Sequence, residues 1–320
     1  MSDGRTVSVV IPTFNGEKYI QATLDSIANQ SVAPNEVIIS DDNSSDRTIA
    51  VARECGDLFE FFKIVHGNRE GISKNYLNAL DASTGDIIVV GDQDDPWRKD
   101  KLEQIVNTFD SRTDVTLFSS DSVLVDQSLN ELGDTLRGGV AVSERLSKAV
   151  EKDDFIQFIK GLRLDAHTLS FRESVKSLVT SPALQGHNNI WFEEKVAIAA
   201  LCLGRLVYRA DALTLYRQHK NQHTHKKSDQ HKEQVSRQER LHLMASLLED
   251  PHSLAVIDDV ELKRRKQLLE DYLVFLSHRS TIRPSLATSL NYLFRGTYAR
   301  YNRRGFLSFC KDISKSLGVS

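Results

Sequence analysis

Residues 86–97 read Asp-Ile-Ile-Val-Val-Gly-Asp-Gln-Asp-Asp-Pro-Trp, an apolar run that ends in a group of carboxylates. Consecutive β-branched residues followed by a turn are typical of a short strand buried on both faces. Three aspartates within four residues repel one another at close range unless they share a cation. Oxygen ligands of this kind suit Mg²⁺ or Mn²⁺, which also coordinate a diphosphate. The stretch therefore predicts a strand of a parallel sheet followed by a metal-binding loop.

The acidic loop also has a plainer interpretation. Asp95 stands directly before Pro96, where a carboxylate is well placed to cap the next helix. The two interpretations are compatible, because Asp95 can cap the helix while Asp92 and Asp94 face a ligand.

Strand and helix patterns alternate on either side of this stretch. Short apolar runs predict strands, and apolar residues three or four positions apart predict helices between them. This order implies right-handed crossovers, so the first 125 residues are predicted to form an α/β domain with a mostly parallel sheet flanked by helices. The predicted strands are 7–11, 36–40, 61–65, 86–90 and 115–118, and the predicted helices are 17–30, 46–54, 73–82 and 98–109.

The pattern is weaker after the fifth predicted strand. A helix is predicted over 191–203 and ends at Gly204. Two strand-like pieces follow it, at 206–209 and 213–216.

The last third of the chain differs in composition. Residues 220–238 are polar and rich in Lys, His and Gln, which predicts a loop or linker. Amphipathic helices are predicted from Glu239 onward. We therefore expect a nucleotide-binding type of α/β domain over 1–225, and a linker with a helical C-terminal extension over 226–320.

The overall composition is that of an ordinary globular protein. Apolar residues make up 40% and charged residues 27% of the 320 residues, and the formal net charge is −3. This balance gives no general attraction to nucleic acid, and no nucleic-acid partner is expected. Cys55, Cys202 and Cys310 are too scattered for a disulfide framework and suit a reducing compartment. With neither a signal-peptide pattern nor an apolar run of about 18 residues, we expect a cytoplasmic protein.

Polar residues follow the other predicted strands where each of them ends. The first strand leads into residues 12–16, the second into 41–46 and the third into 67–75. Ligands bind beyond the carboxyl ends of the strands in sheets of this type. Each of these loops alone is equally well explained as a turn with a helix cap, and the acidic fourth loop is the stronger signal.

Four segments together resemble family 2 of the glycosyltransferases. They are Val-Val-Ile-Pro-Thr-Phe-Asn at 9–15, Ile-Ser-Asp-Asp-Asn-Ser-Ser-Asp at 39–46, Asp-Gln-Asp-Asp-Pro-Trp at 92–97 with Lys-Leu-Glu at 101–103, and Leu-Tyr-Arg-Gln-His at 215–219. The resemblance is to bacterial rhamnosyltransferase-like and polysaccharide-assembly members, and it covers about residues 6–225. It implies the GT-A fold, a nucleotide-sugar-binding α/β domain, with Mn²⁺ or Mg²⁺ as cofactor.

The resemblance implies how a nucleotide sugar is held. The loop after the first strand would line the base and ribose pocket, and Asp41 or Asp42 would accept a hydrogen bond from the N3–H of uracil or thymine. A UDP- or dTDP-linked donor is therefore favoured. Arg69 or Lys74 would approach the pyrophosphate. The implied donor-binding set is Pro12, Thr13, Asn15, Asp41, Asp42, Arg69, Lys74, Asp92 and Gln93.

The resemblance also implies the metal ligands and the reaction. Asp92 and Asp94 would form the metal-binding motif, with Asp94 the favoured direct ligand, and His219 would lie near the metal or the phosphates. The metal would neutralise the charge that builds on the diphosphate leaving group. The family resemblance implies one inverting displacement, in which an Asp or Glu takes the proton of the acceptor hydroxyl.

The sequence departs from the family pattern at the expected base. In the resembling proteins the base stands at the start of a helix, often as His-Asp, about eleven residues before a glycine. Counting back from Gly204 leads to Glu193 with Glu194 beside it, and Phe192 stands where the histidine is expected. We favour Glu193 over Glu194, since a glutamate can do the same chemistry. Alternatively, both are ordinary acids in the first turn of a helix, where the helix dipole favours them.

These expectations describe an inverting glycosyltransferase of bacterial surface polysaccharide assembly, with a glycan or lipid-linked glycan as acceptor. Seven cations against one acid in the last forty residues suggest a peripheral contact with anionic lipids at the inner face of the plasma membrane. A basic helix packed on the domain is the plainer explanation. Two rival functions stay open. A sugar-1-phosphate nucleotidyltransferase has a similar fold, but its Gly-rich basic loop is missing after the first strand, and a non-catalytic scaffold would keep the fold without the base.

Overall fold

The parallel half of the central sheet is built from four of the predicted apolar runs. The computed structural model describes residues 5–187, 189–220, 230–249, 257–280, 286–294, 297–301 and 305–316. Strands β1 to β4 run parallel in the spatial order β3-β2-β1-β4, and a helix joins each strand to the next. The bounds are β1 Val7–Thr13, α1 Ile20–Ala28, β2 Glu36–Asp41, α2 Thr48–Glu54, β3 Phe62–His66, α3 Ile72–Ala82 and β4 Ile87–Val90.

Alternate residues of these strands enter two hydrophobic clusters, one on each face of the sheet. Val10 and Ile88 belong to the cluster that includes the buried residues of α3. Val9 and Val89 belong to the cluster formed with α1 and α4 Lys101–Ser111. Because both faces are buried, the strands read as unbroken apolar runs in the sequence.

The second half of the sheet is mixed. β5 Val115–Val125 pairs in parallel with β8 Arg205–Arg217. It pairs antiparallel with β6 Glu131–Thr135 and β7 Ser170–Arg172. β7 also pairs antiparallel with β4, and so it joins the two halves into one sheet of eight strands.

β8 corrects one prediction from the sequence. The pieces at 206–209 and 213–216 are one continuous strand, and the prediction of two strands was wrong. Register shifts between β8 and β5 fall between these pieces and interrupt the regular alternation of buried and exposed residues. The last residues of this strand lie next to the loop after β4, which the sequence predicts to bind a metal.

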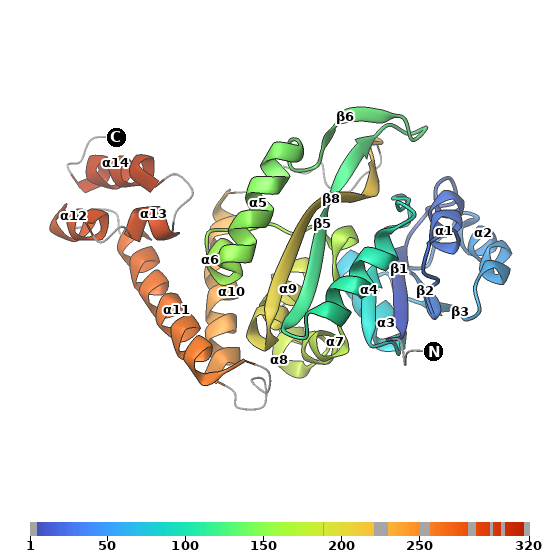
Figure 1. Ribbon diagram of the computed structural model, residues 1–320, viewed down its shortest axis with the longest axis horizontal. Coiled ribbons are helices and arrows are strands. Elements are labelled where there is room, and N and C mark those ends of the chain that lie inside the picture. The colour runs from blue at the N-terminus through green and yellow to red at the C-terminus, as the bar shows by residue number, and fades with distance from the viewer. Residues whose placement is uncertain are drawn as a thin grey trace.

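Further helices cover the mixed half of the sheet. α5 lies along β8, and α9 lies against β5 and β8 (Figure 1). α9 is buried along almost its whole length, and it begins within one residue of the predicted start. The bounds are α5 Val140–Lys152, α6 Asp154–Ile159, α7 Glu173–Val179, α8 Pro182–Gln185 and α9 Phe192–Leu203, with 3-10 turns at Gly56–Leu58 and Ala166–Thr168.

The C-terminal helices begin earlier than the sequence predicted. α10 starts at Gln230, so residues 230–238, predicted as part of a loop, are helical. That stretch contains no Gly or Pro, and its Lys, Gln, Glu and Arg residues are good helix formers despite their polarity. The helices are α10 Gln230–Glu249, α11 Asp259–Ser280, α12 Leu286–Phe294, α13 Thr297–Tyr301 and α14 Gly305–Ser316.

α10 continues the hydrophobic core of the α/β domain. Leu241, Met244 and Leu248 are buried in the same cluster as the apolar residues of α9. α11 leads away from the sheet to α12, α13 and α14, which gather at its far end (Figure 1). The predicted boundary at residue 225 lies outside the described residues, so the division of the chain there stays a prediction. Among the described helices, none combines the length and apolar character that crossing a bilayer requires.

Candidate active site

The acidic loop after β4 turns one of its three carboxylates into the interior. Asp95 is buried, and its Oδ1 accepts a hydrogen bond from the backbone N–H of Arg217 at 2.9 Å. Its Oδ2 is buried without a hydrogen-bond partner among the described residues. Asp95 therefore ties the loop to the end of β8. It does not cap α4, which begins at Lys101, so the capping interpretation was wrong.

Asp94 and His219, two of the predicted metal-site residues, lie together. Asp94 Oδ2 is 2.8 Å from His219 Nε2, and the backbone carbonyl of Asp94 accepts a hydrogen bond from Arg217 Nε at 2.9 Å. The His219 ring lies against Tyr19, with ring centroids 4.7 Å apart. A carboxylate oxygen and an imidazole nitrogen so close together can share a divalent cation or a proton.

Tyr76 and His167 complete the acidic cluster, although the sequence did not single out either of them. The Tyr76 hydroxyl donates a hydrogen bond to Asp92. His167 Nδ1 lies 3.9 Å from Asp92 Oδ2 and 3.9 Å from Asp95 Oδ2. One ligand atom from each of Asp92, Asp95 and His167 lies within 4.8 Å of the other two. His167 stands in the irregular middle of the chain, outside any motif, so no sequence signal pointed to it.

The acids of this cluster have raised pKa values although the buried Lys101 faces them. Burial, reinforced by the Asp94 carboxylate, raises the pKa of Asp92 to about 7. Burial also raises the pKa of Asp95 well above its usual range, and it lowers the pKa of Lys101 to about 7. Carboxylates that favour protonation, together with the unpartnered Asp95 oxygen, fit a hard divalent cation such as Mn²⁺ or Mg²⁺.

The carboxylate of Asp41 accepts three hydrogen bonds from neighbouring residues inside the fold. Thr13 Oγ1 and Ser44 Oγ donate hydrogen bonds to its Oδ1 at 2.8 and 2.6 Å, and the Ser44 backbone N–H donates to its Oδ2 at 2.8 Å. The side chain is buried. Its carboxylate therefore holds the ends of β1 and β2 together.

Asp42 is the more accessible of the two acids after β2. Its Oδ2 accepts a hydrogen bond from the Gly71 backbone at 3.1 Å. Its Oδ1 lies against the backbone of Gly67, where an added Cβ would stand 2.8 Å from it, and the residue as a whole is 8% exposed. Arg69 and Lys74 are exposed on the following loop and on the first turn of α3.

Other residues of the predicted donor set shape the strand-end loops. The Phe14 backbone N–H donates to Gln93 Oε1 at 3.0 Å, and Gln93 Nε2 donates to the Phe14 carbonyl at 3.1 Å. Asn15 Oδ1 accepts a hydrogen bond from the backbone of the loop after β2 at 2.9 Å. Pro12 and Thr13 are buried at the end of β1. The Gln93 and Asn15 amides thus bind neighbouring backbone and fasten the three loops to one another.

The first turn of α9 brings one of its two glutamates to the acidic cluster. Burial raises the pKa of Glu193 to about 7, and the charges of Glu194 and Asp92 act in the same direction. Burial and the charges of Asp92 and Glu193 in turn raise the pKa of Tyr76. Glu194 instead binds Arg240 of α10, whose Nη1 lies 2.6 Å from Glu194 Oε1. Of the two candidate bases, Glu193 is the one beside the cluster.

Phe192 occupies the position where a histidine was expected. Its ring stacks on the Tyr76 ring, with centroids 4.4 Å apart and an interplanar angle of 10°. Because the Tyr76 hydroxyl binds Asp92, the stack places the start of α9 beside the acidic loop. Phe192 therefore fixes the turn that carries Glu193.

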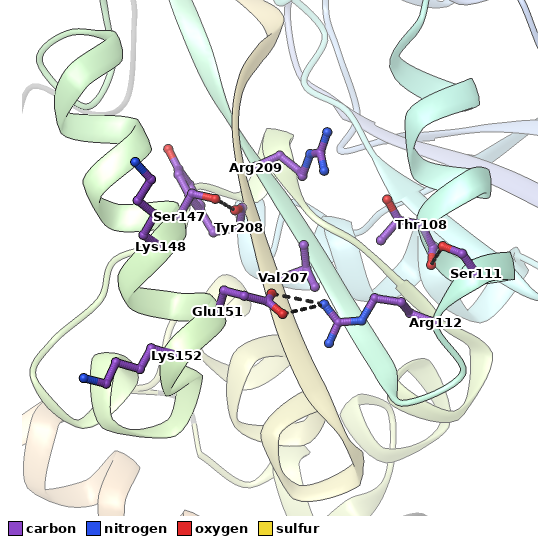
Figure 2. A pocket seen from close by; sticks show the side chains of 10 residues that line it. All are labelled: Thr108, Ser111, Arg112, Ser147, Lys148, Glu151, Lys152, Val207, Tyr208 and Arg209. Carbon is purple, nitrogen blue, oxygen red and sulfur yellow. Dashed lines mark hydrogen bonds and ion pairs between the residues drawn. The ribbon is translucent and has the colours of Figure 1, made fainter.

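A separate cavity of about 650 Å³ lies between α4, α5 and the first part of β8. Figure 2 shows the Glu151 carboxylate directed at Arg112, with both oxygens 3.1 Å from Arg112 Nη1. Lys148, Lys152 and Arg209 add positive charge to its lining. Among the described residues that line it, none belongs to the acidic cluster, so this cavity is not the candidate active site.

Comparison with known proteins agrees with this geometry. Residues 8–178, more than half of the chain, match the family model described as glycosyl transferase family 2. The chain belongs to this family, and the resemblance recognised from its motifs is confirmed. Membership of a glycosyltransferase family argues against the alternative of a nucleotidyltransferase.

Two curated relatives match about a third of this chain. The putative glycosyltransferase EpsH of Bacillus subtilis is 31% identical over 111 residues, which are 35% of this chain and 32% of that protein. The putative teichuronic acid biosynthesis glycosyltransferase TuaG of the same organism is 31% identical over 119 residues, which are 37% of this chain and 47% of that protein. The chain thus matches less than half of the length of either relative.

The fold has a solved counterpart in TarS of S. aureus. Residues 1–349 of TarS, in complex with UDP-GlcNAc, match with a TM-score of 0.56 and 17% sequence identity, over 98% of this chain and 90% of that chain. At this identity the likeness concerns the fold alone. It confirms the predicted GT-A fold with a mostly parallel sheet and a helical C-terminal region.

Proposed function

We propose that this protein is a metal-dependent, inverting glycosyltransferase that moves a sugar from a UDP- or dTDP-linked donor to an acceptor hydroxyl. The observation that carries the proposal is the position of Glu193. It directly follows Phe192, whose ring stacks on Tyr76, and the Tyr76 hydroxyl binds Asp92 of the acidic cluster. Burial raises the pKa of the Glu193 carboxyl to about 7. A base close to a leaving-group site is what a single displacement at an anomeric carbon requires.

Asp94 and His219 would hold Mn²⁺ or Mg²⁺, with Asp92 facing the same space. The bound ion would neutralise the negative charge on the departing nucleoside diphosphate. Asp95 and His167 lie deeper in the same cluster and add a carboxylate oxygen and an imidazole nitrogen to the groups that face a cation.

Asp42 would recognise the base of the nucleotide. It is 8% exposed against 1% for Asp41, whose oxygens are occupied by Thr13 and Ser44. A carboxylate accepts hydrogen bonds and cannot donate them when ionised. It therefore suits the N3–H of uracil or thymine and disfavours cytosine, whose N3 carries no hydrogen.

The phosphates and the acceptor would lie between the start of α3 and the start of α9. Arg69 and Lys74, both exposed, would approach the pyrophosphate. Glu193 would take the proton from the acceptor hydroxyl. Trp191, directly before α9, is 59% exposed and offers a flat apolar face to an acceptor sugar.

We place the reaction in cell-surface polysaccharide assembly, with a growing or lipid-linked glycan as acceptor. A relative named for teichuronic acid biosynthesis supports this role. Contact with anionic lipid is part of the proposal. Of the seven cations in the last forty residues, the three that the structure describes are exposed: Arg300, Lys311 and Lys315. The other four, Arg283, Arg295, Arg303 and Arg304, lie outside the described residues.

Flotation with liposomes that contain anionic lipid tests the membrane part. The intact protein is expected to rise with the vesicles, and to stay at the bottom with neutral vesicles or at high salt. Protein that remains at the bottom with anionic vesicles would remove this part and leave the glycosyltransferase proposal untouched.

A thermal-shift panel of nucleotide sugars, with and without Mn²⁺, tests the donor part. UDP- and dTDP-sugars are expected to raise the Tm in the presence of Mn²⁺, because a ligand at a hundred times its Kd stabilises the folded state by about 2.7 kcal/mol. CDP serves as the control for base recognition, because cytosine N3 carries no hydrogen. Metal-dependent transfer or hydrolysis then distinguishes an enzyme from a non-catalytic binding protein. The proposal fails if no nucleoside diphosphate shifts the Tm at millimolar metal.

A further inference from the structure

The helix that carries the proposed base is held at both ends by the C-terminal helices. α9 has Glu193 and Glu194 in its first turn. Arg240 of α10 binds the first turn, and Arg265 of α11 binds the last turn. The C-terminal extension is therefore in direct contact with the element that completes the candidate active site.

Arg240 binds Glu194 in a buried environment. Its Nη1 lies 2.6 Å from Glu194 Oε1, and only 7% of its side chain is exposed. Its guanidinium also lies 5.0 Å from the centre of the Phe158 ring. A charge-assisted hydrogen bond of this kind is strong, and removing one partner leaves the other charge buried and uncompensated.

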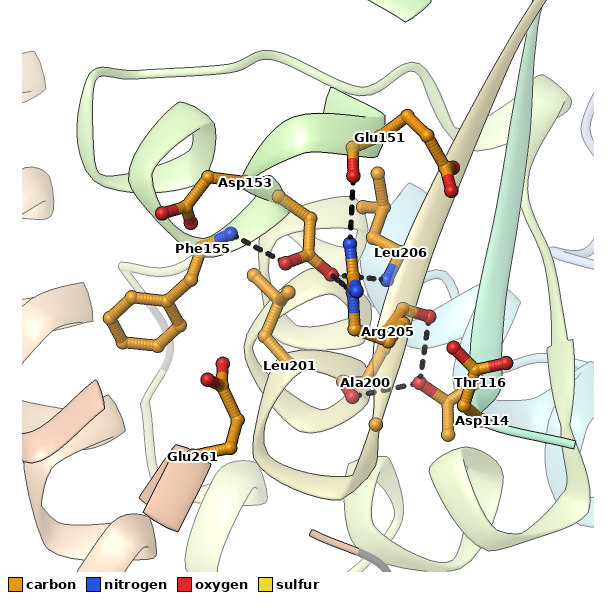
Figure 3. Close-up of polar contacts among 12 residues, drawn as sticks. Asp114, Thr116, Glu151, Asp153, Phe155, Ala200, Leu201, Arg205, Leu206 and Glu261 are labelled. Carbon is orange, nitrogen blue, oxygen red and sulfur yellow. Dashed lines mark hydrogen bonds and ion pairs between the residues drawn. The ribbon is translucent and has the colours of Figure 1, made fainter. Parts of the chain in front are cut away.

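At the other end, Arg265 and Thr116 bind the last carbonyl groups of α9. Arg265 Nη1 donates hydrogen bonds to the carbonyls of Leu201 and Gly204, the second at 3.0 Å. Thr116 Oγ1 donates to the carbonyl of Ala200 at 2.8 Å (Figure 3). The last carbonyls of a helix have no partners within it, and a cation there is favoured by the helix dipole. These contacts hold the helix in position along its axis.

Glu193 lies among negative charges. After burial, the charges of Glu194, Asp165 and Asp92 contribute to its raised pKa. Within the described residues, Arg240 is bound to the carboxylate that directly follows Glu193 in the chain. The titratable groups on the surrounding elements are Lys74 and Tyr76 on α3, Asp92 after β4, Asp165 before the turn Ala166–Thr168, Glu194 and Lys195 on α9, and Glu239 and Arg240 on α10.

We propose that Arg240 is a positioning residue for glycosyl transfer: by binding Glu194, it leaves Glu193 as the carboxylate that takes the acceptor proton. This inference rests on the role proposed for Glu193. In this role Arg240 acts through the charge and position of Glu194, which its guanidinium binds. α10 is then part of the active site, and the catalytic unit continues beyond the predicted boundary at residue 225.

A double-mutant cycle between Arg240 and Glu194 tests the inference. Arg240→Gln leaves the Glu194 carboxylate uncompensated beside Glu193, which favours the protonated form of Glu193. We expect kcat at pH 6.5 to fall about tenfold and the acidic limb of the pH profile to move up by about one unit, with the donor KM unchanged. In the Arg240→Gln/Glu194→Gln double variant, kcat should return to within about threefold of wild type. Arg240→Lys keeps the cation and should retain most of the activity.

A direct titration makes the test independent of turnover. In protein labelled with ¹³C at the glutamate carboxyl groups, the Glu193 resonance is identified by its absence in Glu193→Gln. We expect its titration midpoint to rise in Arg240→Gln and to return in the double variant. If Arg240 served only as packing against Phe158, Glu194→Gln would not reverse the effect of its loss.

Arg264→Gln is the matched control on the C-terminal helices. Arg264 of α11 binds Glu261 and Asp153, so its loss should change neither kcat nor the pH profile. The inference is overturned if Arg240→Gln keeps both the wild-type kcat and the wild-type Glu193 midpoint, or if the double variant stays as slow as the single one. Failure of the proposed function is distinct, because Glu193→Gln would then retain transfer.

Discussion

Asp94 Oδ2 and His219 Nε2 lie 2.8 Å apart, although 125 residues separate them in the chain. The contact arises because β8 runs parallel to β5 and ends beside the loop after β4. The backbone hydrogen bond from Arg217 to Asp95 holds the two segments together at this point. Two segments that are separate motifs in the sequence thus form one candidate metal site.

Asp94→Ala is expected to remove the metal-dependent part of donor binding. Without this carboxylate the cation loses a charged ligand, and the diphosphate loses its neutralising partner. The Mn²⁺-dependent Tm shift with UDP should disappear, and transfer should fall by at least about a hundredfold. His219→Ala should act in the same direction with a smaller effect. Asp81→Ala, at an exposed position of α3, is the control, and full transfer by Asp94→Ala would disprove the metal site.

Transfer is expected to slow as the pH falls below about 7. A general base must be deprotonated, and burial raises the pKa of Glu193 to about 7. At saturating Mn²⁺, kcat/KM for the acceptor should fall about tenfold per pH unit below that value. Glu193→Gln should lower kcat by about 10²- to 10⁴-fold at every pH.

Glu194→Gln provides the comparison for the pH profile. Removing the neighbouring negative charge lowers the pKa of Glu193, so the acidic limb should move to lower pH while transfer is retained. A rate that does not change with pH around 7, or a larger loss in Glu194→Gln than in Glu193→Gln, would show that Glu193 is not the base.

Asp42→Asn and Asp41→Asn are expected to affect different properties. Asp42→Asn should weaken UDP binding by about ten- to a hundredfold and leave stability nearly unchanged, because a hydrogen bond to a charged acceptor contributes about 1.5–3 kcal/mol. Asp41→Asn should lower the free energy of unfolding by about 1–3 kcal/mol, because an amide cannot accept all the hydrogen bonds from Thr13 and Ser44. Calorimetric titration with UDP and urea unfolding measure the two effects, and the reverse assignment would make Asp41 the base-binding residue.

Lys101→Met is expected to destabilise the fold. Lys101 is fully buried. Its Nζ donates hydrogen bonds to the His167 carbonyl at 3.0 Å and to the Thr214 hydroxyl at 2.9 Å. Its charge faces Asp95 and Asp92. Its loss leaves buried carboxylates without a counter-charge, which should lower the free energy of unfolding by about 3 kcal/mol.

The pH dependence of this loss is specific to Lys101. The pKa values of Asp92 and Asp95 are raised, so both carboxyl groups become neutral as the pH falls below them, and the destabilisation should shrink in acid. The pKa of Lys101 is itself lowered to about 7, so its counter-charge also fades above that pH. Urea unfolding at pH 7 and at pH 5 therefore measures this difference. Lys99→Met, at an exposed neighbouring position, should change little at either pH. An equal loss at both pH values would mean that packing, and not charge, is the role of Lys101.

Local patterns predicted the parallel half of the sheet well. The apolar runs at 7–11, 36–40 and 86–90 became β1, β2 and β4 with shifts of one or two residues. A strand buried on both faces carries an apolar residue at almost every position, so its signal is local and strong. β6 and β7 were not predicted, because exposed or three-residue strands carry almost no such pattern.

The sequence predicted only those residues of the candidate site that belong to recognisable motifs. Asp94 and His219 stand in recognisable segments, and they meet in the structure. Tyr76, His167 and Arg240 were missed, because each belongs to the site only through contacts between elements that are distant in the chain.

By itself, the sequence determined the order of strands and helices in the parallel half of the sheet, the family, and the short list of acids at the strand ends. All of these depend on residues close together in the chain. Only the tertiary structure decided what each acid does. Asp95 turns inward, and Asp41 accepts hydrogen bonds from Thr13 and Ser44. Glu194 binds an arginine of α10, while Glu193 lies beside the acidic cluster. The physical reason is that the charge and role of a carboxylate depend on its burial and on its partners. Both of these come from segments that only the folded chain brings together.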